Sequence, residues 1–463
     1  MIKEFVLALD IGTSSVRAAL FDHGGRRIEG TLVQRGYPLA TGAEGQATLD
    51  PRELLAKARV CFQGAMRAAP NSSQLMAVGV TCYWHSLLGV DAGGEPLTPI
   101  YTWADSRCRP DAALLREEID ERLIHAETGC MLRASFWPAK LRWLRRTETK
   151  LFKRVSLWMS PAEWVQWKLT GQRQCALGMA TGTGLFNPST LSWSPRLLEA
   201  AGIRENQLSP VSDEAMSWKN TPLFPAIGDG AASNLGSQCQ GPDWGAINVG
   251  TSAAMRVIRS GQKVRTPFGL FGYRIDALRY LVGGAASNAG NLRAWCLREL
   301  RLTASGEALE VALTNRPSSK LTVLPYWTAE RAPRWNEDCT GLIAGITQDT
   351  TALDLLAAIT DASYLRLAEI AEAIPSAQPI RWLVSGGILN SDRALKRLAS
   401  ALNSPLYRTP EPEASLRGAA VFALEKLGCA PERLQPGRPV QPNKADAESF
   451  KAQRVRALQF MGL

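Results

Sequence analysis

Residues 7–22 have the sequence LALDIGTSSVRAALFD, in which two runs rich in Val, Leu and Ala flank a Gly-Thr-Ser-Ser tetrapeptide. Apolar runs on either side of a short turn of small residues are typical of a β-hairpin. Residues 244–258 (WGAINVGTSAAMRVI) repeat the Gly-Thr-Ser turn at the same offset from the preceding apolar run. Matching context on both sides of the turn favours an ancient duplication, so we predict two similar halves.

Helical and strand patterns alternate on either side of these hairpins. This alternation is typical of an α/β fold, with a sheet in each half. From Cys429 onward the chain is rich in Pro and charge, which predicts a surface tail ending in a short helix near Val455. The periodicity of apolar residues predicts helices at Pro51–Ala69, Ala285–Leu300, Leu353–Ile374 and Arg393–Leu402, and strands at Met76–Cys82 and Trp382–Val384.

Composition narrows the class of protein. A chain of 463 residues, 45% hydrophobic and 21% charged, is long enough for two or three ordinary globular domains. We find no uninterrupted apolar window of about 18 residues and no signal-peptide core, so we expect a cytoplasmic protein without a membrane segment. The nine cysteines lie singly, without metal-site spacing, as expected of thiols in a reducing compartment. The net charge of +10 favours anionic ligands, and no nucleic-acid-binding motif accompanies it.

The two Gly-Thr-Ser turns are candidate phosphate-binding loops. Glycine lets the backbone approach a ligand closely, while neighbouring amides and hydroxyls can converge on phosphate oxygens. A single turn of this kind also fits an ordinary hairpin, but two related turns can hold one nucleotide from both sides of a cleft. The candidate residues are Gly12, Thr13 and Ser14 in the first turn, and Gly250 and Thr251 in the second.

Two aspartates are placed where a phosphotransferase would need them. Asp10 closes the first strand beside its turn, where a carboxylate could hold a hydrated Mg²⁺ against phosphates; the alternative is an Asp that only stabilises the turn. Asp229 lies between two glycines at the start of a helix-compatible segment. By itself it would most often be a helix N-cap, and the alternative is a general base that takes a proton from a substrate hydroxyl.

A second cluster follows the predicted strand Met76–Cys82. His85, one of three histidines, comes directly after Trp84, and Trp103-Ala104-Asp105-Ser106-Arg107 follows a short loop later. An aromatic ring, a carboxylate and a guanidinium close together suit the hydroxyls and the apolar face of a polyol. The structural alternatives are a satisfied histidine and a surface Asp–Arg pair that contributes little to stability.

Taken together, these motifs resemble the FGGY carbohydrate kinases, and within that family the gluconokinases. The resemblance covers about residues 5–428. Two positions depart from the usual pattern: Trp84 stands where Met is common, and Asp392-Arg393-Ala394 replaces an aromatic-rich helix start. The motifs that carry the resemblance, in family order, are LALDIGTSSVRAALFD, WHSLLGVDAGGEPLTPIYTWADSR, ATGTGLFNPSTLSW, Gly228-Asp229-Gly230, INVGTSAAMR, LPYWTAERAPRWN and VSGGILNSDR.

The resemblance implies a fold of two actin-like (ribonuclease H-like) domains with a catalytic cleft between them. The corresponding domain prediction is a sugar-binding domain at residues 1–238, a nucleotide-binding domain at 239–428 and the tail at 429–463. It further implies that ATP phosphates meet the two turns, that Gly386, Gly387 and Ser391 border the adenosine, and that Asp10 acts through Mg²⁺. Trp84, His85 and Asp105 would then line the sugar site, with Asp229 as the base.

The sequence therefore predicts ATP-dependent phosphorylation of a terminal hydroxyl, with D-gluconate as the leading acceptor. Xylulose, another pentulose or a polyol is the nearest alternative acceptor. A non-catalytic sensor of nucleotide or sugar is the alternative from another class, although a sensor has no need of a base. Arg107 and Arg331 are candidate contacts for a substrate carboxylate, and the resemblance leaves a homodimer open.

Overall fold

The chain divides into two compact units, and the computed structural model describes residues 4–314 and 320–462. Each unit is built from three segments that alternate along the sequence. The first unit comprises Met1–Gln238, Arg259–Leu281 and Glu413–Leu434, and the second comprises Cys239–Ile258, Val282–Pro412 and Gln435–Leu463.

The first unit is organised around a mixed sheet with the order β12-β13-β6-β1-β2-β3, in which β14 also pairs with β6. The predicted hairpin is present: β1 and β2 are antiparallel, with Ile11 opposite Val16. On its other side, β1 runs parallel to β6. The strands are β1 (Glu4–Ile11), β2 (Ser15–Phe21), β3 (Val33–Gly36), β6 (Gln74–Cys82), β12 (Met216–Trp218), β13 (Thr221–Leu223) and β14 (Ile227–Gly228).

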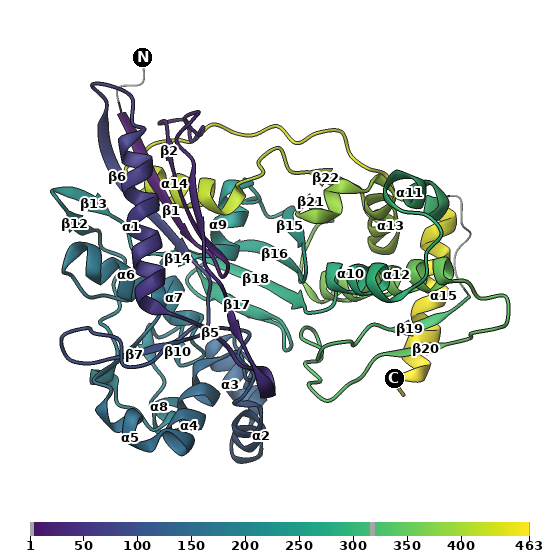
Figure 1. Ribbon diagram of the computed structural model, residues 1–463, viewed down its shortest axis with the longest axis horizontal. Coiled ribbons are helices and arrows are strands. Elements are labelled where there is room, and N and C mark those ends of the chain that lie inside the picture. The colour runs from purple at the N-terminus through teal and green to yellow at the C-terminus, as the bar shows by residue number, and fades with distance from the viewer. Residues whose placement is uncertain (1–3, 315–319, 463) are drawn as a thin grey trace. The chain divides into compact units, whose positions relative to one another are not determined.

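Two helices from distant parts of the sequence pack on this sheet, and Figure 1 draws one in front of the strands and the other behind. Helix α1 (Pro51–Arg67) packs against β1, β2 and β3, and begins at Asp50, whose side chain accepts the backbone N–H groups of Arg52 and Glu53. Helix α14 (Ala414–Lys426) packs against β1, β6 and α9 (Asp229–Gly236).

Glycines allow α14 to approach its neighbours closely. A Cβ at Gly79 of β6 would lie 2.1 Å from the carbonyl oxygen of Ala419. A Cβ at Gly418 would lie 1.7 Å from the carbonyl oxygen of Ala232 in α9. Side chains at either position would separate these elements, so the contact of α14 with β6 and α9 depends on glycine.

The rest of the first unit extends from the carboxyl end of β6 and surrounds a core that includes Trp137, Trp158 and Trp164. Its helices are α2 (Arg109–Glu118), α3 (Glu121–Thr128), α4 (Trp137–Thr147), α5 (Thr149–Arg154), α6 (Pro161–Thr170), α7 (Leu177–Thr181) and α8 (Pro195–Ala201). Its short strands are β4 (Ala40–Thr41), β5 (Ala47–Leu49), β7 (Leu88–Val90), β8 (Ile100–Tyr101), β9 (Leu157–Met159), β10 (Phe186–Asn187) and β11 (Ser192–Trp193).

The second sheet has the order β17-β18-β16-β15-β21-β22. Strands β15 and β16 form the second predicted hairpin, with Val249 opposite Ala253, and β15 runs parallel to β21. Each sheet thus joins an antiparallel hairpin to a parallel third strand, which is the similarity predicted from the repeated turn. The strands are β15 (Trp244–Val249), β16 (Ala253–Ser260), β17 (Phe271–Arg274), β18 (Arg279–Ala286), β21 (Arg381–Ser385) and β22 (Leu406–Arg408).

The second unit's helices enclose a separate apolar core that includes Leu292, Leu309 and Ile359. The predicted helix Ala285–Leu300 is wrong at its start, because residues 285–286 end β18 and the helix begins at Gly290. The C-terminal helix is longer than predicted and begins at Lys444. The helices are α10 (Gly290–Glu299), α11 (Gly306–Thr314), α12 (Ala352–Ala373), α13 (Asp392–Leu402) and α15 (Lys444–Phe460), and a small sheet joins β19 (Thr322–Leu324) to β20 (Leu342–Ala344).

Membrane-spanning helices and clusters of metal-binding side chains were sought in residues 4–314 and 320–462. No helix there has the length and apolar composition needed to cross a membrane. No group of three or more His, Cys, Asp or Glu side chains there could hold a metal ion. All nine cysteines are free thiols, and seven of them are buried.

Candidate active site

Three parallel strand ends bring two of the predicted site aspartates to one edge of the first sheet. Asp10 lies at the end of β1, and Asp229 directly follows β14. Both strands pair with β6, where Cys82 lies opposite Ile11 on one side and Gly228 on the other. Both carboxylates act on the thiol of Cys82, whose pKa is raised by burial and further by these two negative charges. Ligands commonly bind at the carboxyl ends of such strands.

Asp10 is buried and tightly held. Its Oδ2 accepts hydrogen bonds from Arg17 Nη2 at 2.6 Å and from Ser415 Oγ at 2.7 Å. Arg17 also donates from Nη1 to Glu413 at 2.6 Å, so the segment leading into α14 helps to hold the pair. Burial raises the pKa of the Asp10 carboxyl, and the guanidinium and the hydroxyl only partly oppose that rise. Oδ1 is the oxygen of Asp10 that these bonds leave available.

Asp229 is the first residue of α9 and is half-buried. The N-cap is Gly228, which corrects the alternative of Asp229 as a cap, although Asp229 Oδ1 does accept the N–H of Gly230 at 2.7 Å. A carboxylate in the first helical turn is favoured by the helix dipole and by free amides. The local structure therefore fixes a carboxylate at the sheet edge.

The first Gly-Thr-Ser turn is connected to the predicted sugar loops. Gly12 closes the turn by donating its N–H to the carbonyl of Ser15 at 3.0 Å, while Ser14 is exposed. Thr13 Oγ1 accepts the indole N–H of Trp103 at 3.2 Å, and the backbone N–H of Trp103 bonds Ser86 Oγ at 3.1 Å. These bonds bring the turn, the loop after β6 and the loop at residues 102–107 together.

His85 and Trp84 occupy the loop after β6. His85 has a positive φ of 66°, which is uncommon outside glycine, and its Nδ1 donates to the carbonyl of Gly182 at 2.5 Å. Its ring packs edge-on against Phe136 and Tyr273, at centroid distances of 4.7 and 5.4 Å. Since a carbonyl can only accept, Nδ1 carries the proton in this contact.

Asp105 is buried and forms a two-point ion pair. Arg107 donates to it from Nε at 3.0 Å and from Nη2 at 2.6 Å, and the guanidinium also lies 4.6 Å from the ring of Trp143. Asp105 accepts the backbone N–H of Ala47 as well, at 3.2 Å. This pair is therefore not a loose surface contact. Because its donors point at Asp105, Arg107 is poorly placed to receive a substrate carboxylate.

Behind this loop lies Lys140, whose side chain is 1% exposed. Its ammonium donates to the carbonyl oxygens of Ala134 at 2.5 Å, Ser135 at 3.1 Å and Asp105 at 3.3 Å. A buried cation is tolerated when such partners surround it. Lys140 thus ties the backbone at Asp105 to the segment that precedes α4.

In the second unit, the Gly250-Thr251 turn is packed against two glycine segments. The N–H groups of Gly290 and Asn291 donate to the carbonyls of Gly250 and Thr251, both at 3.0 Å. A Cβ at Gly290 would lie 2.4 Å from the carbonyl oxygen of Gly250. Gly386, with φ +91°, would place a Cβ 2.5 Å from the carbonyl oxygen of Val249, and Gly387 follows it. Gly250, Thr251, Gly386 and Gly387 are therefore neighbours at the ends of β15 and β21.

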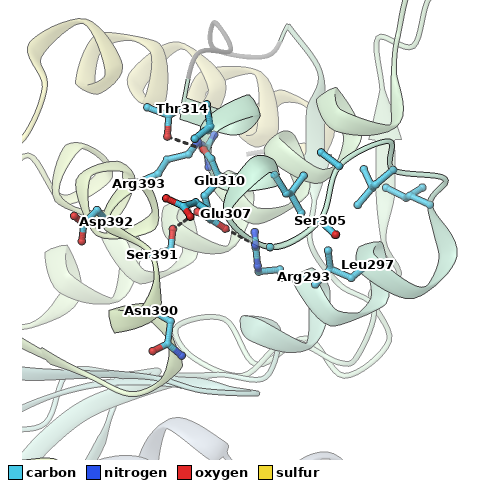
Figure 2. Close-up of a pocket in the computed structure, with 16 residues that line it drawn as sticks. Arg293, Leu297, Ser305, Glu307, Glu310, Thr314, Asn390, Ser391, Asp392 and Arg393 are labelled. Carbon is cyan, nitrogen blue, oxygen red and sulfur yellow. Dashed lines mark hydrogen bonds and ion pairs between the residues drawn. The ribbon is translucent and has the colours of Figure 1, made fainter.

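A cavity of about 1090 Å³ opens between α10, α11 and the start of α13. Ser391 lines it and is also the N-cap of α13, accepting the N–H of Ala394 at 3.1 Å. Figure 2 shows Glu310 between Ser391 and Arg293, bonded to both. Leu297, Leu300 and Leu302 supply apolar walls. The volume is slightly above the range of about 300–1000 Å³ that is usual for small-molecule sites. Gly386 and Gly387 are not among its lining residues.

Comparison with known proteins identifies the family. Residues 5–228 match the profile of the FGGY family of carbohydrate kinases, N-terminal domain, and residues 245–426 match that of the C-terminal domain. The chain belongs to the FGGY family of carbohydrate kinases. This confirms the family predicted from the motifs.

Relatives of this FGGY kinase bear different names. A gluconokinase of Bacillus subtilis (strain 168) is 24% identical over 453 residues, covering 92% of this chain and 88% of that protein. Glycerol kinase 2 of Streptomyces coelicolor (strain ATCC BAA-471 / A3(2) / M145) is 26% identical, covering 90% and 88%. These names give the class of enzyme and do not agree on an acceptor.

Solved structures show that the FGGY kinase has the predicted fold of two actin-like (ribonuclease H-like) α/β domains. The ligand-bound xylulose kinase from Lactobacillus acidophilus matches with a TM-score of 0.92, at 24% identity over 99% of this chain and 98% of that chain. The gluconate kinase from the same organism matches with a TM-score of 0.91, at the same identity and coverage.

Sequence reasoning missed several side chains that surround the site of the FGGY kinase. Arg17 could have been found, because a hairpin turning at residues 12–15 places positions 10 and 17 opposite each other. Lys140 carries no sequence signal of its place, because lysine is usually exposed, whereas this one is buried. Tyr273 carries no local signal, since 188 residues separate it from its partner His85 in the chain.

Proposed function

We propose that this kinase transfers the γ-phosphate of ATP to a terminal hydroxyl of a sugar or sugar acid, with D-gluconate as the leading acceptor. The observation that carries the proposal is the placement of Asp10 and Asp229 at one sheet edge, on either side of β6. One carboxylate would serve the phosphates and the other the acceptor, with the sugar loops attached to the same edge through Thr13 and Trp103.

Asp229 is the base in this proposal. As the acceptor oxygen forms its bond to the γ-phosphorus, the hydroxyl proton passes to the Asp229 carboxylate, the bond from phosphorus to the bridging oxygen breaks, and ADP leaves. The hydrogen bond from the Gly230 amide to Oδ1 helps to orient the carboxylate that would receive the proton. Trp84, His85 and Asp105 would hold the acceptor so that one hydroxyl lies beside this carboxylate.

Asp10 suits a Mg²⁺ ion that is held mainly by ATP. Mg²⁺ in kinases commonly binds one or two carboxylates, several waters and the substrate phosphates. Because Arg17 and Ser415 occupy Oδ2, Asp10 would bind through Oδ1 or through a water on it. When bound, the ion neutralises phosphate charge. The residues present fit this arrangement.

The remaining predicted contacts are assigned to ATP. Gly12, Thr13 and Ser14 in the first unit, and Gly250 and Thr251 in the second, would donate amides and hydroxyls to phosphate oxygens. Gly386, Gly387 and Ser391 would border the adenosine. The apolar walls and polar rim of the cavity beside Ser391 are what a nucleoside requires.

An acceptor screen tests the proposal and its alternatives. ADP release would be measured with ATP and Mg²⁺ against D-gluconate, D-xylulose, D-ribulose and glycerol. We expect acceptor-dependent ADP with D-gluconate at the highest kcat/KM. A higher kcat/KM with a pentulose or glycerol would replace D-gluconate as the proposed acceptor but leave the proposed phosphate transfer in place. Binding of an acceptor without any ADP release would replace the kinase by a sensor.

Asp229→Asn tests the base itself. The amide oxygen can still accept from Gly230, so α9 should start as before, but it cannot take a proton. We expect kcat to fall by about a thousandfold or more, because loss of a general base has an effect of this order. ADP binding should not change. Asp120→Asn, at the N-terminus of α3, is the matched control and should keep full turnover. Near wild-type turnover in Asp229→Asn would remove this mechanism.

A further inference from the structure

Trp84 lies in the loop after β6, with 6% of its surface exposed. Its indole N–H donates to the carbonyl of Gly178 at 3.0 Å. The indole also packs against the ring of Tyr273, with the centroids 4.9 Å apart and the planes at 57°. The indole thus has a fixed orientation, held by a hydrogen bond at its edge and by a ring on its face.

Two glycines make room for this indole. A Cβ at Gly228 would lie 1.9 Å from Trp84 Cε2 and 2.0 Å from Cζ2, and a Cβ at Gly182 would lie 2.4 Å from Cδ1. Separations under about 3 Å do not occur for real Cβ atoms, so the six-membered ring rests directly on the backbone of residue 228. This contact excludes any side chain at position 228.

Gly228 is joined directly to Asp229. It is the last residue of β14, pairs with Cys82, and is the N-cap of α9, where no side chain provides a capping hydrogen bond. The far end of α9 is held against α14, because a Cβ at Gly236 would lie 1.8 Å from the carbonyl oxygen of Ala414. The start of α9 is held by strand pairing on one side and by the indole on the other.

We propose that Trp84 is a positioning residue for the base, setting the place of Asp229 through its contact with the Gly228 backbone. The inference rests on the proposed function, and adds to it a role for the tryptophan that lies beyond contact with the acceptor. Close-packed groups transmit small displacements, and a misplacement of about 1 Å in a reacting group can cost about 100-fold in rate.

The test is a double-mutant cycle on kcat between positions 84 and 228. Gly228→Ala inserts a methyl group into the space of the indole, so we expect kcat to fall about 100-fold. Trp84→Met removes the ring but leaves a flexible apolar side chain, and should lower kcat about 10-fold by loosening Asp229. In the double variant the added methyl group meets no indole, so its kcat should exceed that of Gly228→Ala alone by about 10-fold.

A matched pair separates positioning from a general packing defect. Gly94 has a similar contact, since its Cβ would lie 2.6 Å from Trp167 Cζ3, but its φ of +80° adds a backbone strain that loss of the Trp167 ring does not relieve. Gly94→Ala, Trp167→Met and their double variant should show coupling in the unfolding midpoint while kcat stays unchanged. All variants are assayed for kcat and for the KM of MgATP with D-gluconate, D-xylulose and glycerol, and the KM of MgATP should not change.

The outcomes are distinct. If the wild-type enzyme releases ADP, but the double variant is no faster than Gly228→Ala, or Gly228→Ala alone keeps kcat within threefold, the positioning role is refuted and the kinase assignment stands. If the wild-type enzyme releases no ADP with any of the acceptors, the assignment fails, and this role fails with it.

Discussion

Asp10 and Arg17 are a cross-strand pair of the first hairpin, and their side chains form an ion pair 2.6 Å long between Oδ2 and Nη2. The pair places a cation beside the carboxylate assigned to Mg²⁺. Since burial raises the pKa of Asp10 and Arg17 lowers it, the guanidinium helps to keep this carboxylate ionised in a dry position.

Arg17→Met should move the acid limb of activity to higher pH. Without the cation, the already raised pKa of Asp10 rises further, so the carboxylate is protonated at a higher pH as the solution is acidified. We expect the acid limb of kcat/KM for MgATP to shift upward by about one pH unit or more. Arg26→Met, which breaks an exposed pair with Glu432, is the control and should leave the profile in place. An unshifted limb in Arg17→Met would contradict this account of Asp10.

The same pKa shift has a consequence for stability. Because the folded-state pKa of Asp10 lies above its value in the unfolded chain, the folded state binds the proton more tightly. Its contribution is therefore present below the unfolded pKa and is lost as pH rises through the folded one. The free energy of unfolding of Asp10→Asn, measured by denaturant unfolding, should therefore fall less with rising pH than that of the wild type across that window. An identical pH slope in both proteins would show that Asp10 titrates normally.

Lys140→Met should destabilise the first unit and weaken acceptor binding. The substitution leaves two buried carbonyls and a partly buried one without their common donor, and we expect about 2–4 kcal/mol lower free energy of unfolding. The KM for the acceptor should rise, because the Asp105 backbone loses its anchor, while the KM for MgATP stays the same. Lys168→Met, which loses an exposed pair with Glu95 and a contact with the Trp167 ring, should cost under about 1 kcal/mol. Unchanged stability and KM would exclude Lys140 as a support of the sugar loop.

Gly290→Ala should weaken nucleotide binding selectively. The added methyl group would lie 2.4 Å from the carbonyl oxygen of Gly250 and so displace the Gly250-Thr251 turn, which we assign to the ATP phosphates. We expect ADP affinity, measured by calorimetry, to fall by about 10-fold or more, as for about 1.4 kcal/mol or more of lost binding. Gly171→Ala meets no atom within 4 Å and should retain wild-type affinity. Equal ADP affinities in both variants would show that the Gly250 turn takes no part in nucleotide binding.

Ser391→Ala tests the polar rim of the cavity. Loss of the N-cap of α13 should cost about 1 kcal/mol of stability. Loss of the bond to Glu310 should also leave that side chain held by Arg293 alone and lower ADP affinity several-fold. Asn443→Ala removes the N-cap of α15 and should cause a similar loss of stability without changing ADP affinity. If the two variants bind ADP equally well, Ser391 acts only as a cap.

The sequence was sufficient where the signals were local. Both hairpins, β6, β21, α1 and α12 formed close to their predicted bounds, because turn residues and apolar periodicity are properties of neighbouring residues. The predicted start of α10 was wrong for the same reason. The apolar residues before Gly290 suit a strand as well as a helix, and their pairing in β18 outweighs the helical pattern.

Candidate site residues could be predicted from the sequence only where a local motif marks them. Asp10 and Asp229 were singled out by the glycines and strands around them. Their approach to the same edge, however, depends on β1 and β14 choosing the two sides of β6, which is a non-local choice. The packing of Trp84 on Gly228 and of Tyr273 on His85 depends on the same kind of tertiary pairing, which no local pattern encodes.

Helix α14 has a consequence for biosynthesis. Ser415, which bonds Asp10, and the surface that covers Gly79 are both supplied by the segment at residues 413–434. A nascent chain that ends at residue 412 therefore lacks α14, and the side of the first sheet that α14 covers is still exposed. The early strands must wait until residues 413–434 have been synthesised before the edge that holds Asp10 is complete, so we expect chaperones to cover that side during translation.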